Sequence, residues 1–151
     1  MAPPNPDFQK TVLNIFQKAP FVQHLGIRLF EVERGRCSTG LELSDIHLQQ
    51  DGFVHAGVLA TLADHTAGGA GATLVAKDEA VLSVEFKINL LRPAVGKTLR
   101  CTAQVLKAGK RLTVVESEVF VAVDETEKLV AKAVVTLAIV QKIPAEGEKK
   151  E

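Results

Sequence analysis

The sequence has few cysteines and no excess of either charge, and both absences narrow the class of protein. Its 151 residues contain two cysteines, which are too few for a disulfide framework and are typical of a reducing compartment. Lys plus Arg number 18, and Asp plus Glu also number 18. Nucleic acids and anionic membranes usually bind proteins that have more basic than acidic residues. We therefore expect neither of them as the main partner.

Long apolar runs and a leader sequence are also missing. No uncharged apolar stretch reaches the roughly 20 residues that a membrane-spanning helix needs. The first seven residues have neither the basic start nor the apolar centre of a signal peptide. We therefore expect a cytoplasmic protein with one domain over residues 1–151, whose ends are flexible over about residues 1–6 and 144–151.

The spacing of apolar residues predicts an α+β domain. Helical periodicity predicts a first helix over residues 8–19 and a long helix over 54–76, with strands between them at 26–33 and 36–43. Alternation then predicts four more strands, at 82–90, 99–105, 112–123 and 129–140. In the first of these four, Leu82, Val84 and Phe86 are expected on one face and Ser83 on the other. Meandering antiparallel strands with helices on one face are typical of the α+β class.

The long helix is unusual because it is poor in charge and rich in glycine. From Gly52 to Ala76 the chain has one acidic residue, Asp64, and no Lys or Arg. Each glycine inside a helix costs roughly 1 kcal/mol relative to alanine, so we expect a backbone, ligand or partner to approach closely. Asp64 is either a solvated aspartate or a partly buried carboxylate kept for chemistry, and its surroundings favour the second. It belongs to a stripe of small residues: Gly57, Ala60, Thr61, Asp64, Ala67, Gly68 and Gly71.

The start of this helix adds a second chemical group. The first amides, near Ala56 and Gly57, lack intrahelical acceptors and carry the positive end of the helix dipole, so they can stabilise an oxyanion. Asp64 lies eight residues further on, which is about 12 Å along the axis. One small group cannot contact both in a single helix. We therefore expect a site that combines Asp64 of one subunit with the amides of another.

A known family shares these motifs. The segment Gln49-x-x-Gly52-x-x-His55-Ala56-Gly57, followed by Leu62-Ala63-Asp64, resembles the hotdog-fold acyl-CoA thioesterases of the phenylacetate-degradation (PaaI-like) branch. The resemblance covers roughly residues 20–140. It implies a curved antiparallel six-stranded sheet wrapped around one long helix, plus a short N-terminal helix. It also implies a homodimer, with a homotetramer as an open alternative, and an active site at the subunit interface.

The resemblance further implies roles for individual residues. Asp64 would act as general base or nucleophile, and the amide of Ala56, beside that of Gly57, would hold the oxyanion. Gln49 and His55 would lie around the thioester, and Ser83 would come from the second subunit to orient water. Apolar side chains would line the acyl pocket, and the candidates are Phe53, Leu59 and Phe86. Basic side chains would contact the phosphates of coenzyme A, and the candidates are Arg92, Lys107, Lys110 and Arg111.

Several alternatives stay open at this stage. His55 is more often a structural residue at a helix start than a proton-transfer group. The same fold would also serve as a module that binds acyl-CoA without cleaving it, or less readily as a hydroxyacyl-thioester dehydratase. The histidines and cysteines show no metal-ligand spacing, so we expect no metal site and no cofactor apart from the coenzyme A of the substrate.

Overall fold

The computed structural model describes residues 4–143. Its helices are α1 (Phe8–Lys18), α2 (Pro20–Leu25), the 3-10 helix η1 (Asp45–His47) and the long helix α3 (Ala56–Ala72). Its strands are β1 (Arg28–Glu33), β2 (Arg36–Glu42), β3 (Glu79–Leu90), β4 (Thr98–Ala108), β5 (Leu112–Val123) and β6 (Thr126–Gln141). The order of elements follows the sequence prediction, with α2 and η1 as additions.

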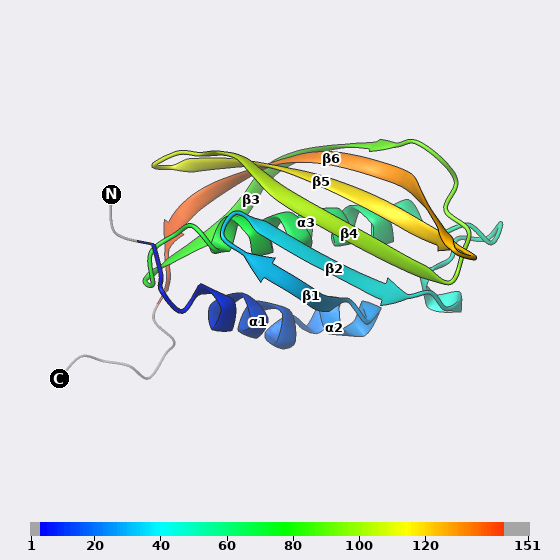
Figure 1. Cartoon of the computed structure of the whole chain (residues 1–151), viewed down its shortest axis with the longest axis horizontal. Coiled ribbons are helices and arrows are strands. Elements are labelled where there is room, and N and C mark those ends of the chain that lie inside the picture. The colour runs from blue at the N-terminus through cyan, green and yellow to red at the C-terminus, as the bar shows by residue number, and fades with distance from the viewer. Residues whose placement is uncertain (1–3, 144–151) are drawn as a thin grey trace.

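The six strands form one antiparallel sheet in the order β1-β2-β4-β5-β6-β3. The sheet curves around α3, and α1 and α2 lie beside the β1 edge (Figure 1). Leu62, Ala63 and Ala67 of α3 have no exposed surface and pack into the inner face of the sheet, which is the face toward α3. The predicted α+β fold, a curved sheet around one long helix, is confirmed.

Element boundaries differ from the prediction where local contacts end a helix or a turn. Pro20 ends α1 as expected, but it also starts α2, since proline fits the first position of a helix. The long helix covers Ala56–Ala72 instead of 54–76. At its end the Thr73 hydroxyl donates to the Ala70 carbonyl, and Arg34 donates to the Thr73 carbonyl. β6 begins early, because Asp124 adopts a left-handed φ of 54° and closes a short turn.

The N-terminal segment is not loose throughout. Asn5 is 3% exposed, and its backbone N–H donates to the Val75 carbonyl at 2.9 Å. Its side-chain amide donates to the Thr11 hydroxyl, and Arg34 donates to its carbonyl. The prediction of a flexible segment over residues 1–6 is therefore wrong at Asn5. Residues 1–3 and 144–151 of the predicted flexible ends lie outside the described residues.

Both cysteines are small buried residues of the sheet. Cys37 on β2 and Cys101 on β4 are buried free thiols. Burial is the main reason that the pKa of each thiol is raised to about 12, so both stay protonated and unreactive near neutral pH.

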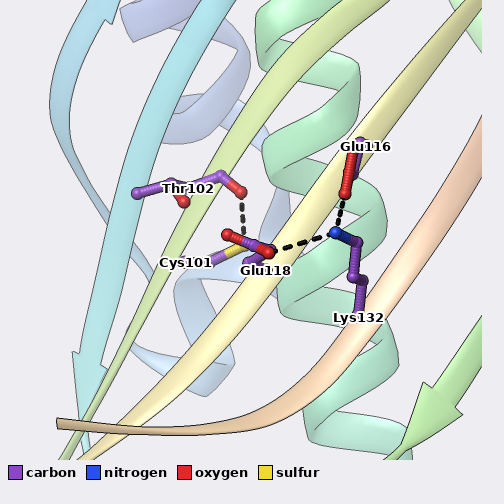
Figure 2. A network of polar contacts seen from close by, with 5 residues as sticks. All are labelled: Cys101, Thr102, Glu116, Glu118 and Lys132. Atoms are coloured by element: carbon purple, nitrogen blue, oxygen red, sulfur yellow. Dashed lines mark hydrogen bonds and ion pairs between the residues drawn. The ribbon is translucent and has the colours of Figure 1, made fainter.

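The outer face of the sheet carries charged side chains. Figure 2 shows Lys132 of β6 between Glu116 and Glu118 of β5, on the side of the strands away from α3. Hydrogen bonds to these two carboxylates raise the pKa of Lys132. Surface pairs of this kind contribute little to stability, so the sheet is stabilised mainly by its inner face.

One edge of the sheet is long and apolar. β3 pairs with β6 on one side, and no other strand of residues 4–143 pairs with it on the other. Leu82, Val84, Phe86 and Leu90 are 60%, 58%, 44% and 52% exposed. Natural sheets rarely leave such an edge uncovered, because its free N–H and C=O groups pair readily with another strand.

No helix of the described residues is long and apolar enough to cross a membrane.

Glycine allows close packing at one face of α3, and this yields a first stability prediction. A Cβ on Gly71 would lie 2.4 Å from Cδ1 of the fully buried Leu137, whereas one on Gly68 would meet nothing within 4 Å. We expect Gly71→Ala to lower the free energy of unfolding by about 1–3 kcal/mol through overpacking. Gly68→Ala should leave it unchanged or raise it by up to about 1 kcal/mol through helix propensity. Urea denaturation of both variants tests this, and equal effects would contradict the packing.

Candidate active site

Asp64 is a half-buried carboxylate in the middle of α3. Its Oδ1 accepts a hydrogen bond from the Ser83 hydroxyl at 2.6 Å. Among residues 4–143, no Lys, Arg or His forms an ion pair with it, and its Oδ2 has no hydrogen-bond partner. Ser83 therefore fixes one oxygen while the other stays available, which suits a general base or a nucleophile.

The position of Ser83 corrects the alternation predicted for β3. Ser83 pairs with the buried Leu137 on β6, and the register then shifts so that Glu85 pairs with Thr136. This bulge at Val84 places Ser83 on the inner face together with Phe86, and places Leu82 on the outer face. Ser83 thus meets Asp64 of its own chain, whereas the family resemblance implied that it would come from the second subunit.

His55 caps the start of α3. Its Nδ1 accepts a hydrogen bond from the Gly57 backbone N–H at 2.8 Å, so the structural interpretation of His55 is confirmed. The expectation that the Gly57 amide is a free oxyanion donor is wrong, since that amide is already engaged. The Ala56 N–H, in contrast, has no acceptor among the described residues. A neutral His55 that accepts at Nδ1 carries its proton on Nε2, which leaves a second donor near the helix start.

Ala56 and Asp64 remain far apart within one chain. Both belong to the uninterrupted helix α3, so the eight residues between them correspond to about 12 Å of axial rise. A thioester carbonyl bound by the Ala56 amide is therefore out of reach of the same chain's carboxylate.

A tight turn precedes the helix and carries Gln49 and Phe53. Leu48 and Val54 form an isolated antiparallel bridge across it, and Gly52 allows its left-handed φ of 83°. The Gln49 side-chain oxygen accepts from the Asp51 backbone N–H, which leaves its NH₂ group for a ligand. The His55 N–H donates to the His47 carbonyl at 2.8 Å, which ties the turn to η1.

A cleft of about 400 Å³ opens beside Asp64 and Ser83. It runs along α3 past His65, Gly68 and Ala72, between α1 and the start of β3. Most of its surface is apolar, which suits an acyl group. Its further lining residues include Thr11, Asn14, Ile15, Val75, Val81 and Leu137.

The lining differs from the predicted set. Leu59 is 3% exposed and packs in the core, because it lies on the face of α3 that the sheet covers. Phe53 and Phe86 are half-exposed and do not line this cleft. The α1 helix forms a wall of the cleft that was not predicted from the sequence. The spacing of Val12 and Phe16 on one apolar face of α1 indicated that this helix packs against the rest of the chain, but not that α3 and β3 form the other walls of the cleft.

The four predicted coenzyme A contacts lie at opposite ends of the sheet. Arg92 donates to the Leu129 carbonyl near the start of β6, while the Arg111 carbonyl accepts from the Ile139 N–H near its end. These β6 positions are ten residues apart, or about 33 Å. Lys107 and Lys110 belong to the same hairpin as Arg111. One chain therefore does not gather all four cations around one ligand.

His65 lies next to Asp64 and packs against α1. Its ring meets Phe16 edge to face, with 4.5 Å between ring centroids. Burial lowers the pKa of His65, and the smaller effect of the Asp64 charge opposes this. The folded chain thus holds this ring neutral near pH 7.

A pH dependence of stability follows from the lowered pKa. Above the unfolded-state pKa of about 6.5 the ring is neutral in both the folded and the unfolded chain. It therefore adds no pH dependence to the free energy of unfolding in that range. As pH falls below that value the unfolded chain binds a proton first, so the free energy of unfolding decreases until the folded-state pKa is reached. We expect the Tm difference between about pH 7 and about pH 5 to be smaller in His65→Phe than in the wild type. An equal drop in both proteins would contradict this.

Comparison with known proteins agrees with this geometry. The family model of the thioesterase superfamily matches residues 51–128. A 1,4-dihydroxy-2-naphthoyl-CoA hydrolase of Listeria monocytogenes is 32% identical over 118 residues, which are 78% of this chain and 94% of that protein. A crystal structure of a thioesterase family protein from Silicibacter pomeroyi has a TM-score of 0.87 and 32% identity, covering 89% of this chain and 99% of the other.

The E. coli PaaI protein shares the fold with a TM-score of 0.78 at 23% identity, over 88% of this chain and 93% of PaaI. At that identity the similarity concerns the fold and leaves the PaaI-like branch open. The matched family model includes α3 with Asp64 and the strands β3, β4 and β5. The chain belongs to the thioesterase superfamily and is a thioester hydrolase with the hotdog fold.

Proposed function

We propose that the protein hydrolyses an acyl-CoA to the free acid and coenzyme A. The observation that carries this proposal is the Asp64 carboxylate, which Ser83 fixes at one oxygen and no cation neutralises, beside a mainly apolar cleft. The relatives support an acyl-CoA substrate, since one of them is named as the hydrolase of an aryl-CoA.

The proposed active unit is a dimer paired through β3. Pairing of two β3 edges would cover their exposed apolar residues and would extend the sheet across both chains. Two antiparallel α3 helices related by a two-fold axis near Ala60 would then place Asp64 beside the partner's Ala56. The small residues of that stretch permit close approach of the two helices, since Gly57 is exposed and Ala60 and Thr61 are half-buried. A tetramer would need further contacts between such dimers.

In the proposed mechanism the thioester carbonyl accepts a hydrogen bond from the Ala56 N–H of one subunit, and Asp64 acts from the other. Asp64 either removes a proton from the attacking water, or attacks the carbonyl carbon itself to form a mixed anhydride that water then hydrolyses to the free acid, which regenerates Asp64. Collapse of the tetrahedral intermediate breaks the C–S bond and releases coenzyme A as its thiolate, which then takes up a proton. Only protein groups and water take part, so we expect activity without a metal or redox cofactor.

Other groups of the chain would assist binding. The Gln49 NH₂ group and His55 Nε2–H remain as donors near the partner's Asp64, and the cations Lys107, Lys110 and Arg111 suit the coenzyme A phosphates. Arg92, at the other end of the sheet, would belong to the site of the other subunit.

Thiol release from a panel of acyl-CoA thioesters tests this function. Alkyl and aryl thioesters of increasing size should be used, because a cleft of 400 Å³ admits groups larger than acetyl. We expect release of free thiol from at least one bulky acyl-CoA. Tight binding without thiol release would instead favour a binding module, and a change in enoyl absorbance without thiol release would favour a dehydratase.

A further inference from the structure

A buried histidine that the proposed mechanism does not use anchors the turn before α3. His47, the last residue of η1, is 3% exposed. Its Nδ1 accepts a hydrogen bond from the Ser44 N–H at 2.9 Å, and its Nε2 lies 2.8 Å from the Leu25 carbonyl oxygen. Because Nδ1 accepts, the proton of the neutral ring is on Nε2 and is donated to that carbonyl. Both ring nitrogens are therefore engaged, and the ring joins η1 to the end of α2.

The backbone of the same residue contacts the residue before Ala56. The His47 carbonyl accepts from the His55 N–H at 2.8 Å. His55 in turn fixes the first turn of α3, since its Nδ1 accepts from the Gly57 N–H and its carbonyl accepts from the Val58 N–H. The Ala56 N–H lies in the same peptide plane as the His55 carbonyl, so its direction follows the backbone of His55. His47 is thus one hydrogen bond away from the residue that directs the proposed oxyanion donor.

The imidazole is the polar link between this turn and the core on the α2 side. Leu25 and Val22 of α2 are 7% and 4% exposed and belong to the core. Among residues 4–143, no other hydrogen bond joins α2 to η1. The other side of the turn is held separately, because the Val54 N–H donates to the Ala94 carbonyl at 3.0 Å. Loss of the imidazole should therefore loosen one side of the turn and leave the chain folded.

We propose that His47 is a positioning residue for thioester hydrolysis, which holds the Ala56 N–H in the direction that the oxyanion needs. An oxyanion donor is effective when it already points to the place where negative charge develops. A displacement of about 1 Å can lower a rate about 100-fold. The inference rests on the proposed function, because the Ala56 N–H has this role only if the protein cleaves a thioester. His47 does not line the cleft beside Asp64 and takes no part in bond breaking.

Two substitutions of His47 separate its link to α2 from its local bond to Ser44. His47→Gln keeps an N–H donor that can reach the Leu25 carbonyl, whereas His47→Asn keeps an acceptor for the Ser44 N–H and is too short to reach Leu25. We expect His47→Asn to lower kcat about 10-fold or more with little change in KM, because an oxyanion donor acts mainly in the transition state. His47→Gln should retain most of the wild-type kcat.

A double substitution tests whether His47 acts through the amide of Ala56. In Ala56→Pro no N–H remains to be directed, so adding His47→Asn should lower kcat by less than about 2-fold further. The matched control is Thr39→Val, which removes a buried hydrogen bond between Thr39 of β2 and Thr66 of α3, away from the start of the helix. It should leave kcat as in the wild type even if Tm falls.

The outcomes separate this inference from the proposed function. Equal losses of kcat in His47→Gln and His47→Asn, or a full additional loss in the double variant, would overturn the inference and leave the hydrolase in place. A loss in Thr39→Val as large as that in His47→Asn would overturn it too. If the wild type cleaves no thioester, the proposed function fails and the inference fails with it. Circular dichroism and Tm show whether each variant is folded at the assay temperature.

Discussion

Replacing Asp64 with asparagine is expected to lower kcat/KM for thioester hydrolysis by about 100-fold or more, while the protein stays folded. Asparagine keeps the shape of the side chain and an oxygen that can accept from Ser83, but it is neither a base nor a nucleophile. Because Asp64 is half-buried and forms no ion pair with a described residue, its loss should cost little stability. Thiol release and thermal unfolding, measured on the same preparation, test both parts.

The matched control for this variant is Asp124→Asn. Asp124 lies in the exposed β5–β6 turn with a left-handed φ of 54°, a conformation that asparagine also tolerates. It should keep wild-type kinetics. Asp64→Asn with nearly full activity would remove Asp64 from the chemistry, whatever the fold of the chain.

Replacing Ala56 with proline removes the proposed oxyanion donor with little change in structure. Proline has no N–H, and it is well tolerated at the first position of a helix, which Ala56 occupies. The preceding His55 has φ −62° and ψ 136°, which are values that a residue before proline prefers. We expect kcat to fall about 10²- to 10³-fold, as for the loss of one oxyanion donor, with little loss of stability.

A second variant at the same position identifies the amide as the cause. Ala56→Ser keeps the backbone N–H and adds a side chain of similar size, so it should retain far more activity than Ala56→Pro. Equal losses in the two variants would indicate that the shape of the pocket, and not the N–H group, determines the rate.

The sequence predicted those parts of the fold that depend on periodicity along one chain. The alternation from residue 82 onward predicted the antiparallel strands, and helical periodicity predicted the long helix that became α3. Asp64 was identifiable because an acid without basic neighbours stands out in such a helix. The distance from Ala56 to Asp64 followed from helix geometry alone.

Features that depend on contacts between elements were not predictable in the same way. A single bulge at Val84 reverses the side on which Ser83 lies, and nothing in the alternation of β3 announces it. Histidine is an uncommon helix cap. The hydrogen bond from the Gly57 N–H to His55, which occupies that amide, was therefore not predictable from the sequence. The role of α1 as a wall of the cleft depends on how it packs against α3, which lies far from it in sequence.

Mixed dimers test most directly whether each active site combines Asp64 of one chain with the Ala56 amide of another. Asp64→Asn and Ala56→Pro chains carrying different affinity tags are co-expressed, and dimers that contain one of each are purified. Such a dimer has one complete site and one site that lacks both groups, so we expect about half of the wild-type activity per dimer. Mixed dimers no more active than either parent would contradict a site shared between two chains.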